Sequence, residues 1–264
     1  MTSHDGKRWA LILGASSGFG GATAVELARS GFDIFGVHLD RRVTMPDVER
    51  VQKAVRDHGR QAHFFNVNAA DPEKRRAVLE GMRAHLTDGG VDVLLHSLAF
   101  GTLRAYVADS AAETVAEKQM DMTLDVMAHS LVYWVQDLVS HGLLRTGGKV
   151  FAMTSAGSTR VWPTYGPVSA AKAALESHIR QLAYELAPRG ITVNGIRAGV
   201  TDTPALRKIP GSDALKEGAR RRNPSGRLTV PEDVAKAIAA LSDPRTYWIT
   251  GNVIGVDGGE DIVG

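Results

Sequence analysis

A phenol and an ammonium stand at a fixed spacing in the segment 155–172, where Tyr165 precedes Lys172 by seven residues. Seven residues are close to two helical turns, so both side chains can face the same side of the chain. A nearby ammonium favours the phenolate and lowers a phenol pKa that is ordinarily about 10. The pair would then supply an acid near neutral pH without histidine or metal. The alternative is that Tyr165 ends a turn and Lys172 is a solvated helix residue.

The helix that must position Lys172 is predicted by apolar residues at three- and four-residue steps. These residues are Leu175, Ile179, Leu182 and Leu186. Gly166 and Pro167 indicate that this helix begins just after the tyrosine. Ser155, at the end of a predicted strand at 149–153, adds a hydroxyl ten residues before Tyr165.

A glycine-rich turn follows a short apolar run at residues 9–13 and leads into a second helical pattern. Glycines let the backbone approach a pyrophosphate closely, and the start of a helix offers it free N–H groups and a positive dipole end. The spacing G-x3-G-x-G between a first strand and a first helix therefore predicts dinucleotide binding, with a plain tight turn as the alternative. The predicted contacts are Gly14, Ser16, Ser17, Gly18, Phe19 and Gly20.

The end of the second predicted strand, 33–39, should meet the adenosine ribose of that dinucleotide. An acidic residue there would accept from the 2′-hydroxyl of NAD, whereas arginines would pair with the 2′-phosphate of NADP. The position that is usually acidic falls on His38. We therefore predict NADPH, bound through Arg41 and Arg42, with NADH as the alternative because Asp40 adjoins them.

Strand patterns alternate with helical stretches along the whole chain, which indicates right-handed crossover units and a parallel sheet. The sequence predicts one α/β domain over 1–264, a Rossmann fold with a doubly wound, mostly parallel seven-stranded sheet flanked by helices. The cofactor should lie beyond the carboxyl ends of the strands. Residues at two of these ends are predicted to border the adenine and the ribose: Asn66 and Val67, then Ser97, Leu98 and Ala99.

A long helical stretch is predicted over 111–141, with Leu124, Met127, Leu131, Val135 and Leu138 along one face. A carboxylate in a packed helix is costly unless it is paired. Asp125 is therefore a candidate for a polar relay that reaches Lys172, or it faces water. His129 is expected to be a packed side chain, because no metal-spaced partner accompanies it.

Residues 204–223 show no strong apolar stripe and contain proline and glycine, which suits a mobile lid over the substrate. Arg220, Arg221 and Arg222 close this segment. The three arginines could attract a phosphate or an acidic carrier protein, although such a run is more often a solvated face.

The composition excludes several classes of protein. The chain has 264 residues and a formal net charge of +2, too balanced for affinity that depends on neutralising nucleic-acid phosphates. It has no cysteine, which excludes disulfides and thiolate chemistry. No stretch approaches the roughly 18 apolar residues of a membrane span, and the N-terminal segment lacks an apolar signal core. We therefore expect a cytoplasmic protein that binds neither nucleic acid nor membrane, and no metal site.

Taken together, these motifs resemble the short-chain dehydrogenase/reductase superfamily along essentially the whole chain. The matching residues, in order, are Gly14, Gly18, Gly20, Ser155, Tyr165, Lys172, Asn194, Gly199, Thr203 and the run Val256, Asp257, Gly258, Gly259. Ordinary members place the tyrosine four residues before the lysine, a position that holds Val168 here. The spacing Tyr-x6-Lys resembles instead the enoyl-acyl-carrier-protein reductase branch, and the segments 198–210 and 223–227 are similar to its NADPH-dependent type III enzymes.

This resemblance implies an NAD(P)H-dependent reduction of an enoyl thioester carried on acyl carrier protein or coenzyme A. Tyr165 would stabilise the enolate and Lys172 would hold the nicotinamide ribose. Gly199, Val200 and Thr203 would border the ribose and carboxamide. A homotetramer is also implied. Ser155 stands where ordinary ketoreductases keep their serine, so a ketoreductase with a displaced tyrosine is the alternative.

Overall fold

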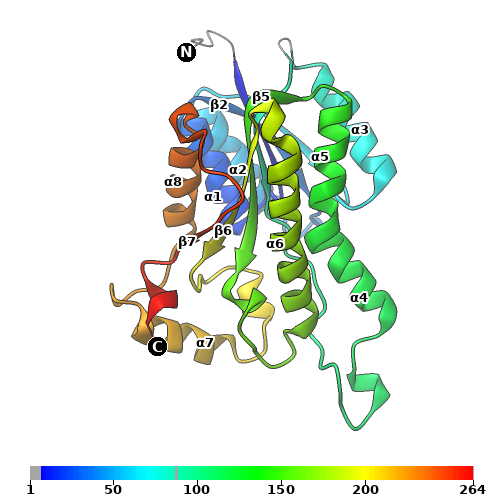
Figure 1. Ribbon diagram of the computed structural model, residues 1–264, viewed down its shortest axis with the longest axis vertical. Coiled ribbons are helices and arrows are strands. Elements are labelled where there is room, and N and C mark those ends of the chain that lie inside the picture. The colour runs from blue at the N-terminus through cyan, green and yellow to red at the C-terminus, as the bar shows by residue number, and fades with distance from the viewer. Residues whose placement is uncertain (1–6, 87–88, 264) are drawn as a thin grey trace.

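Seven parallel strands form one sheet in the order β3-β2-β1-β4-β5-β6-β7 (Figure 1). The computed structural model describes residues 7–86 and 89–263. The strands are β1 Arg8–Leu13, β2 Phe32–His38, β3 Ala62–Asn66, β4 Val91–His96, β5 Leu144–Ser155, β6 Thr192–Ala198 and β7 Val253–Val256. The helices are α1 Gly18–Arg29, α2 Met45–Asp57, α3 Pro72–Arg83, α4 Glu117–Leu124, α5 Ser130–Ser140, α6 Gly166–Leu186, α7 Ser212–Arg222 and α8 Pro231–Leu241. The chain order reverses between β1 and β4, which confirms the predicted doubly wound Rossmann fold.

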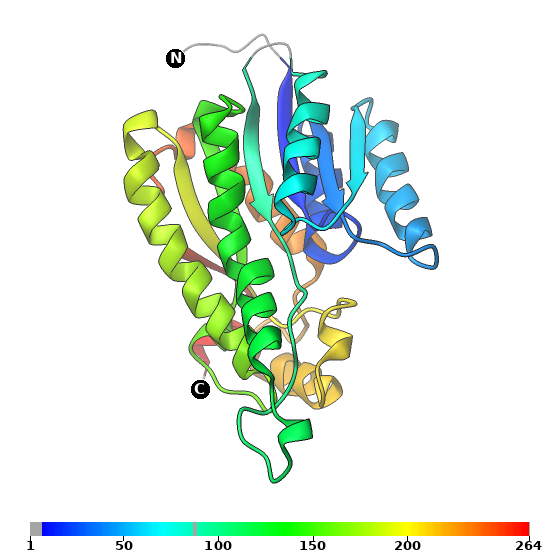
Figure 2. The same cartoon turned by 90° about the vertical axis from the view of Figure 1, so that its right-hand side faces the viewer.

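Apolar side chains hold the sheet between two layers of helices (Figures 1 and 2). Helices α1, α2 and α8 cover one face through a cluster that includes Leu27 and Ile238. Helices α3, α5 and α6 cover the other face through a cluster that includes Leu131 and Ile179. The four predicted stripe residues of α6 are buried, and burying one such side chain stabilises the fold by about 2 kcal/mol. The stripe therefore fixes which face of α6 turns toward the sheet.

The segment 111–141 is not the single helix that the sequence suggests. A 3-10 turn at Ala111–Glu113, helix α4, a π-helical turn at Asp125–His129 and helix α5 follow one another. Ser130 Oγ donates to the Val126 carbonyl at 2.8 Å, a side-chain bond of the kind that bends helices. The predicted inward stripe of this segment is nevertheless buried from Met127 onward, with Leu124 partly buried beside it.

The loops that follow β4, β5 and β6 gather at the carboxyl edge of the sheet, the lower side of Figure 1. Helix α7 lies across this edge, within the predicted lid segment 204–223. The sequence shows no stripe there because α7 buries only Ala219. Residues 1–6, part of the segment in which we found no signal core, lie outside the described residues. None of the helices in the described ranges is long and apolar enough to cross a bilayer.

Candidate active site

Tyr165 stands at the junction between the loop after β5 and helix α6. It is the N-cap residue of α6, which begins at Gly166 as predicted. Its ring lies against Gly157, where an added Cβ would stand 2.5 Å from Tyr165 Cε1 and 3.4 Å from Ser155 Oγ. Thr164 just before it has a φ of 62°, a conformation that costs an L-residue about 1–2 kcal/mol and is held by the surrounding packing. The backbone thus sets the phenol beside the serine hydroxyl.

Lys172 is buried two turns into α6 and reaches back to the sheet. Its Nζ donates to the Met153 carbonyl of β5 at 2.7 Å. Burial lowers the pKa of Lys172 to about 8, while the nearby carboxylate of Glu176 raises it. Glu176 in turn accepts from Thr154 Oγ1 at 2.6 Å. The ammonium therefore lies in a dry, ordered setting between a strand carbonyl and a carboxylate.

The expected lowering of the tyrosine pKa by Lys172 is wrong for this structure. Burial raises the pKa of Tyr165 above its ordinary value, and only the hydrogen bond with Ser155 opposes this shift. The physical reason is that burial penalises the charged phenolate. The Tyr165 hydroxyl consequently stays protonated, and able to donate, throughout the neutral range.

His96, at the end of β4, is a site residue that the sequence analysis missed. It is fully buried, and its Nε2 lies 2.8 Å from Ser130 Oγ. Its Nδ1 has no hydrogen-bond partner among the described residues. Burial, followed by the positive charge of Lys172, lowers the pKa of His96 to about 3. A neutral imidazole therefore neighbours the ammonium, a relation that spacing along the chain cannot reveal.

The glycine turn between β1 and α1 is pressed against the other site loops. Gly14 and Gly18 have φ values of 89° and 53°, which favour glycine. A Cβ added at Gly14 would lie 2.4 Å from the Ser97 carbonyl, and one at Gly18 would lie 3.6 Å from Thr203. One added at Gly20 would stand 2.0 Å from the Gly14 carbonyl. The turn is thus a narrow backbone cradle at the point where the strand order reverses.

The remaining predicted residues of this turn surround the start of α1. Ser17 is the N-cap residue of α1. Ser16 is half-buried, and Phe19 packs partly against the core. Among the described residues, Ser17 makes no side-chain capping bond and the first turn of α1 has no acidic residue. The helix N-terminus therefore keeps its positive dipole end for an anion, and the residues present fit a dinucleotide pyrophosphate.

The end of β2 holds a small polar network where the adenosine is expected. Asp40 Oδ2 lies 3.0 Å from Nδ1 of the buried His38. Asn66 ties the same segment down, because its side chain accepts from the Asp40 N–H at 3.0 Å and donates to the Asp40 carbonyl at 2.9 Å. Arg41 and Arg42 are both exposed. The acidic side chain is therefore engaged with the protein, while both guanidinium groups are accessible.

The other predicted cofactor contacts lie on neighbouring strand ends. Val67 donates its N–H to the His38 carbonyl at 2.8 Å, and Leu98 is partly buried against the core, followed by the exposed Ala99. After β6, Gly199 N–H donates to the Val256 carbonyl at 3.2 Å. The Val200 N–H donates to Oε2 of Glu260, near the C-terminus, at 3.0 Å. The predicted residues thus line one edge of the sheet.

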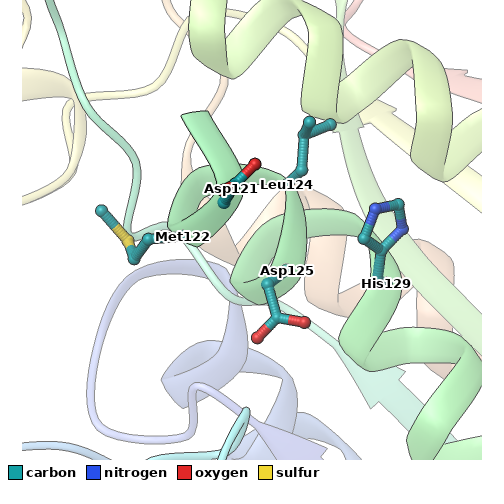
Figure 3. A pocket seen from close by; sticks show the side chains of 5 residues that line it. All are labelled: Asp121, Met122, Leu124, Asp125 and His129. Carbon is teal, nitrogen blue, oxygen red and sulfur yellow. The ribbon is translucent and has the colours of Figure 1, made fainter. Parts of the chain in front are cut away.

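Asp125 does not belong to this group, which corrects its predicted place in a relay. It lines a surface cavity of about 400 Å³ with Asp121, Met122, Leu124 and His129 (Figure 3). Met127, two positions later and on the opposite side of the turn, is the residue that faces inward, toward Gly101. The carboxylate that influences the pKa of Lys172 is instead that of Glu176.

His129, as expected, is a packed side chain, and its Nδ1 lies 3.0 Å from Nε2 of His178 on α6. In residues 7–86 and 89–263 no group of three or more His, Cys, Asp or Glu side chains could hold a metal ion.

Two aromatic side chains connect the surrounding loops to the segment around Tyr165, and neither was singled out from the sequence. Trp162 Nε1 donates to the Pro210 carbonyl of the lid at 3.2 Å. The ring of Tyr106, from the loop after β4, lies against Gly166, where an added Cβ would be 2.7 Å from Tyr106 Cζ. The available signal was the position of these aromatic residues in loops that follow predicted strands.

Comparison with known proteins decides the family. Residues 14–260 match the family described as Enoyl-(Acyl carrier protein) reductase. The chain belongs to this family of short-chain dehydrogenase/reductases. Among its relatives in the family is the 1-cyclohexenylcarbonyl-CoA reductase of Streptomyces collinus, 30% identical over 98% of this chain and 89% of that protein. Another is the 3-oxoacyl-acyl-carrier-protein reductase FabG of Pseudomonas aeruginosa, 28% identical over 95% of this chain and 96% of that protein.

The solved structures agree with this family. The enoyl-acyl-carrier-protein reductase (NADH) from Aquifex aeolicus VF5 has a TM-score of 0.84 and 25% identity, with 97% of both chains covered. The protein is therefore an oxidoreductase of the short-chain dehydrogenase/reductase family, whose members use nicotinamide cofactors.

Proposed function

We propose that this short-chain dehydrogenase/reductase reduces the 2,3 double bond of an enoyl thioester with NADPH. The observation that carries the proposal is the environment of the two candidate acid positions. Val168, where a ketoreductase of the superfamily would keep its tyrosine, is buried in the apolar core. Tyr165 is the phenol at the start of α6, set beside Ser155.

The displaced phenol suits an oxygen that lies further from the carbon that is reduced. In ketone reduction the hydride goes to the carbonyl carbon, and the oxygen that gains charge is about 1.2 Å away. In enoyl thioester reduction the hydride goes to the β-carbon, and the charge develops on the more distant thioester oxygen. An acid that serves this oxygen must move with it. Tyr165, seven residues before Lys172 rather than four, is displaced in this way.

Each residue then has a defined part. A bound nicotinamide cofactor supplies the hydride. The protonated Tyr165 hydroxyl donates a hydrogen bond to the thioester oxygen as negative charge develops there. Ser155 supports the phenol, and Lys172 holds the nicotinamide ribose and places a positive charge beneath the site. The proton that completes the reduction goes to the α-carbon, from Tyr165 or from water.

The proposal of NADPH rests on the network after β2. The carboxylate of Asp40 is turned to His38, so it does not present itself to a ribose 2′-hydroxyl. Arg41 and Arg42 are exposed and can pair with a 2′-phosphate. The carrier of the acyl group, acyl carrier protein or coenzyme A, and assembly as a homotetramer stay predictions from the sequence.

Replacing Arg41 and Arg42 by alanine is expected to raise the KM for NADPH at least about tenfold and the KM for NADH less than about threefold. The reason is that only NADPH offers the phosphate that the guanidinium groups bind. Steady-state kinetics with both cofactors measures this, with Arg220→Ala as a control arginine on exposed α7. An equal rise for both cofactors would show that the arginines do not read the 2′-phosphate.

A second function, reduction of a 3-ketoacyl thioester, is favoured by one observation. Ser155 lies beside Tyr165, as the serine of a ketoreductase would, and FabG is among the relatives. Nicotinamide consumption with crotonyl-CoA and with acetoacetyl-CoA distinguishes the two functions. We expect kcat/KM to be at least about a hundredfold higher for crotonyl-CoA than for acetoacetyl-CoA. The reason is that the ratio depends on how much better the site stabilises the transition state of enoyl reduction than that of ketone reduction. Turnover of acetoacetyl-CoA alone would replace the enoyl proposal by the ketoreductase one.

A further inference from the structure

A short acidic turn near the C-terminus contacts the segments that build the site. The turn contains Asp257, Glu260 and Asp261, and its 3-10 part, Glu260–Ile262, lies beside α7 in Figure 1. Asp257 orders the turn internally, because its Oδ1 accepts from the Gly259 N–H at 2.9 Å and its Oδ2 from the Asp261 N–H at 3.1 Å.

Asp261 fixes this turn to the framework of the site. Its Oδ1 lies 2.8 Å from Nη2 of Arg160, which belongs to the loop leading to Tyr165. Its Oδ2 lies 3.0 Å from Nη2 of Arg197, near the end of β6. The turn is thus anchored to β6 and to the loop that carries the phenol.

Glu260 makes the contacts with functional consequences. Its side chain is buried. Oε2 accepts from the Val200 N–H at 3.0 Å, in the loop predicted to border the cofactor. Oε1 lies 3.7 Å from Nη2 of Arg222, near the end of the lid helix α7. One carboxylate therefore joins the cofactor loop to the lid.

The loop that contains Val200 has room for this carboxylate because position 199 is a glycine. A Cβ added at Gly199 would lie 2.9 Å from Glu260 Oε2 and 2.4 Å from Thr229 Oγ1. Only a glycine leaves room for both oxygens. The loop beyond it continues to Thr203, which lies against Gly18 of the glycine turn. A shift of Glu260 would therefore move the loop at Val200 and, through Thr203, the glycine turn that is predicted to bind the cofactor.

We propose that Glu260 is a positioning residue that couples the lid to the cofactor: its carboxylate orients the Val200 loop and simultaneously holds Arg222 of α7. The inference rests on the proposed use of NADPH at this site. Binding of the cofactor orders the loop, the ordered loop fixes the carboxylate, and the carboxylate holds the lid helix.

Hydrogen-exchange mass spectrometry on the full chain tests the lid contact without cofactor. In Glu260→Gln and Arg222→Gln, amides of α7 are expected to exchange about tenfold faster than in the wild type, the effect of losing one charged contact. Arg220→Gln is the matched control, since it removes a charge from the same helix without touching Glu260. Unchanged exchange of α7 in both variants would overturn the proposal.

The same measurement with saturating NADPH tests the coupling. We expect NADPH to slow the exchange of α7 at least about fivefold in the wild type and in Arg220→Gln, and less than about twofold in Glu260→Gln and Arg222→Gln. Equal protection in all four proteins would contradict the coupling. Failure of the wild type to bind NADPH would reject the proposed cofactor instead, and the exchange rates without cofactor would still decide the lid contact.

A pair of substitutions at Glu260 separates its two contacts by NADPH titration. Glutamine keeps an oxygen acceptor for the Val200 N–H, so the Kd for NADPH is expected to stay within about twofold. Alanine removes the acceptor and is expected to raise this Kd about tenfold. Melting temperatures check that both variants fold, and Arg222→Gln carries the test if alanine does not. Equal Kd values for alanine and wild type would exclude the orienting role.

Discussion

Tyr165→Phe is expected to lower kcat by about 10²–10³-fold, the loss typical of removing one donor to a developing oxyanion. The ring of phenylalanine can keep its contact with Gly157, so the fold should not change. The Kd for NADPH is expected to stay within about twofold, because the ribose is held by Lys172 rather than by the phenol. Single-turnover kinetics with crotonyl-CoA and a fluorescence titration with NADPH measure the two quantities.

Tyr184→Phe is the matched control for this substitution. Tyr184 lies on the same helix, with 79% of its surface exposed, so its hydroxyl should contribute nothing to turnover. A Tyr165→Phe enzyme with wild-type turnover would show that another hydroxyl, such as that of Ser155, supports the oxygen. A large loss in NADPH affinity would show that the phenol holds the cofactor.

The sheet and the glycine turn could be predicted because their signals are local. Apolar strand patterns, a glycine turn and a helical stripe each occupy a few consecutive residues, and parallel strands have few alternative orders. Tyr165 and Lys172 were also predictable, since seven residues place them at the start of one helix. The structure places Tyr165 at the N-cap of α6 and Lys172 within that helix, and their catalytic roles stay predictions.

Other parts of the site depend on contacts between distant segments. The pKa of Tyr165 was predicted with the wrong sign because burial, which decides the direction of the shift, is a property of packing. For Asp125 the sequence left two places open, a relay that reaches Lys172 or a side chain that faces water, and the structure favours the second because Asp125 lines a surface cavity. Glu260 contacts Val200, which lies 60 residues earlier in the chain, and no helix or strand periodicity in the sequence indicates such a pair.

Lys172→Met is expected to lower turnover strongly and, at the same time, to stabilise the fold at neutral pH. Loss of the ammonium should lower kcat by about 10²–10⁴-fold, because the site loses both its ribose contact and its positive charge. The Kd for NADPH should rise about tenfold, as expected for a lost charged hydrogen bond. We expect these losses to be specific to this position, because Lys172 is buried and its Nζ is bonded to the Met153 carbonyl of β5.

The stabilisation follows from the lowered pKa of this lysine. A decrease from 10.5 to about 8 means that burial penalises the charged form by about 3 kcal/mol. Methionine removes this penalty together with a hydrogen bond of about 1 kcal/mol, which leaves a gain of about 2 kcal/mol. For a chain of this size the melting temperature at pH 7 should rise by about 4–8 °C. An unchanged or lower melting temperature would show that the ammonium is stabilising.

The pH dependence of the free energy of unfolding distinguishes removal of a buried charge from better packing of the methionine. Below pH 8 the lysine is charged in both states, so the folded wild type carries the full penalty. Between about pH 8 and 10.5 the unfolded state binds the proton more tightly than the folded one, so wild-type stability rises with pH. The advantage of Lys172→Met should therefore shrink across this window, whereas a packing gain would persist. Lys149→Met is the control: Lys149 is also buried, burial also lowers its pKa, and it lies away from the site, so this variant should gain stability and keep full activity.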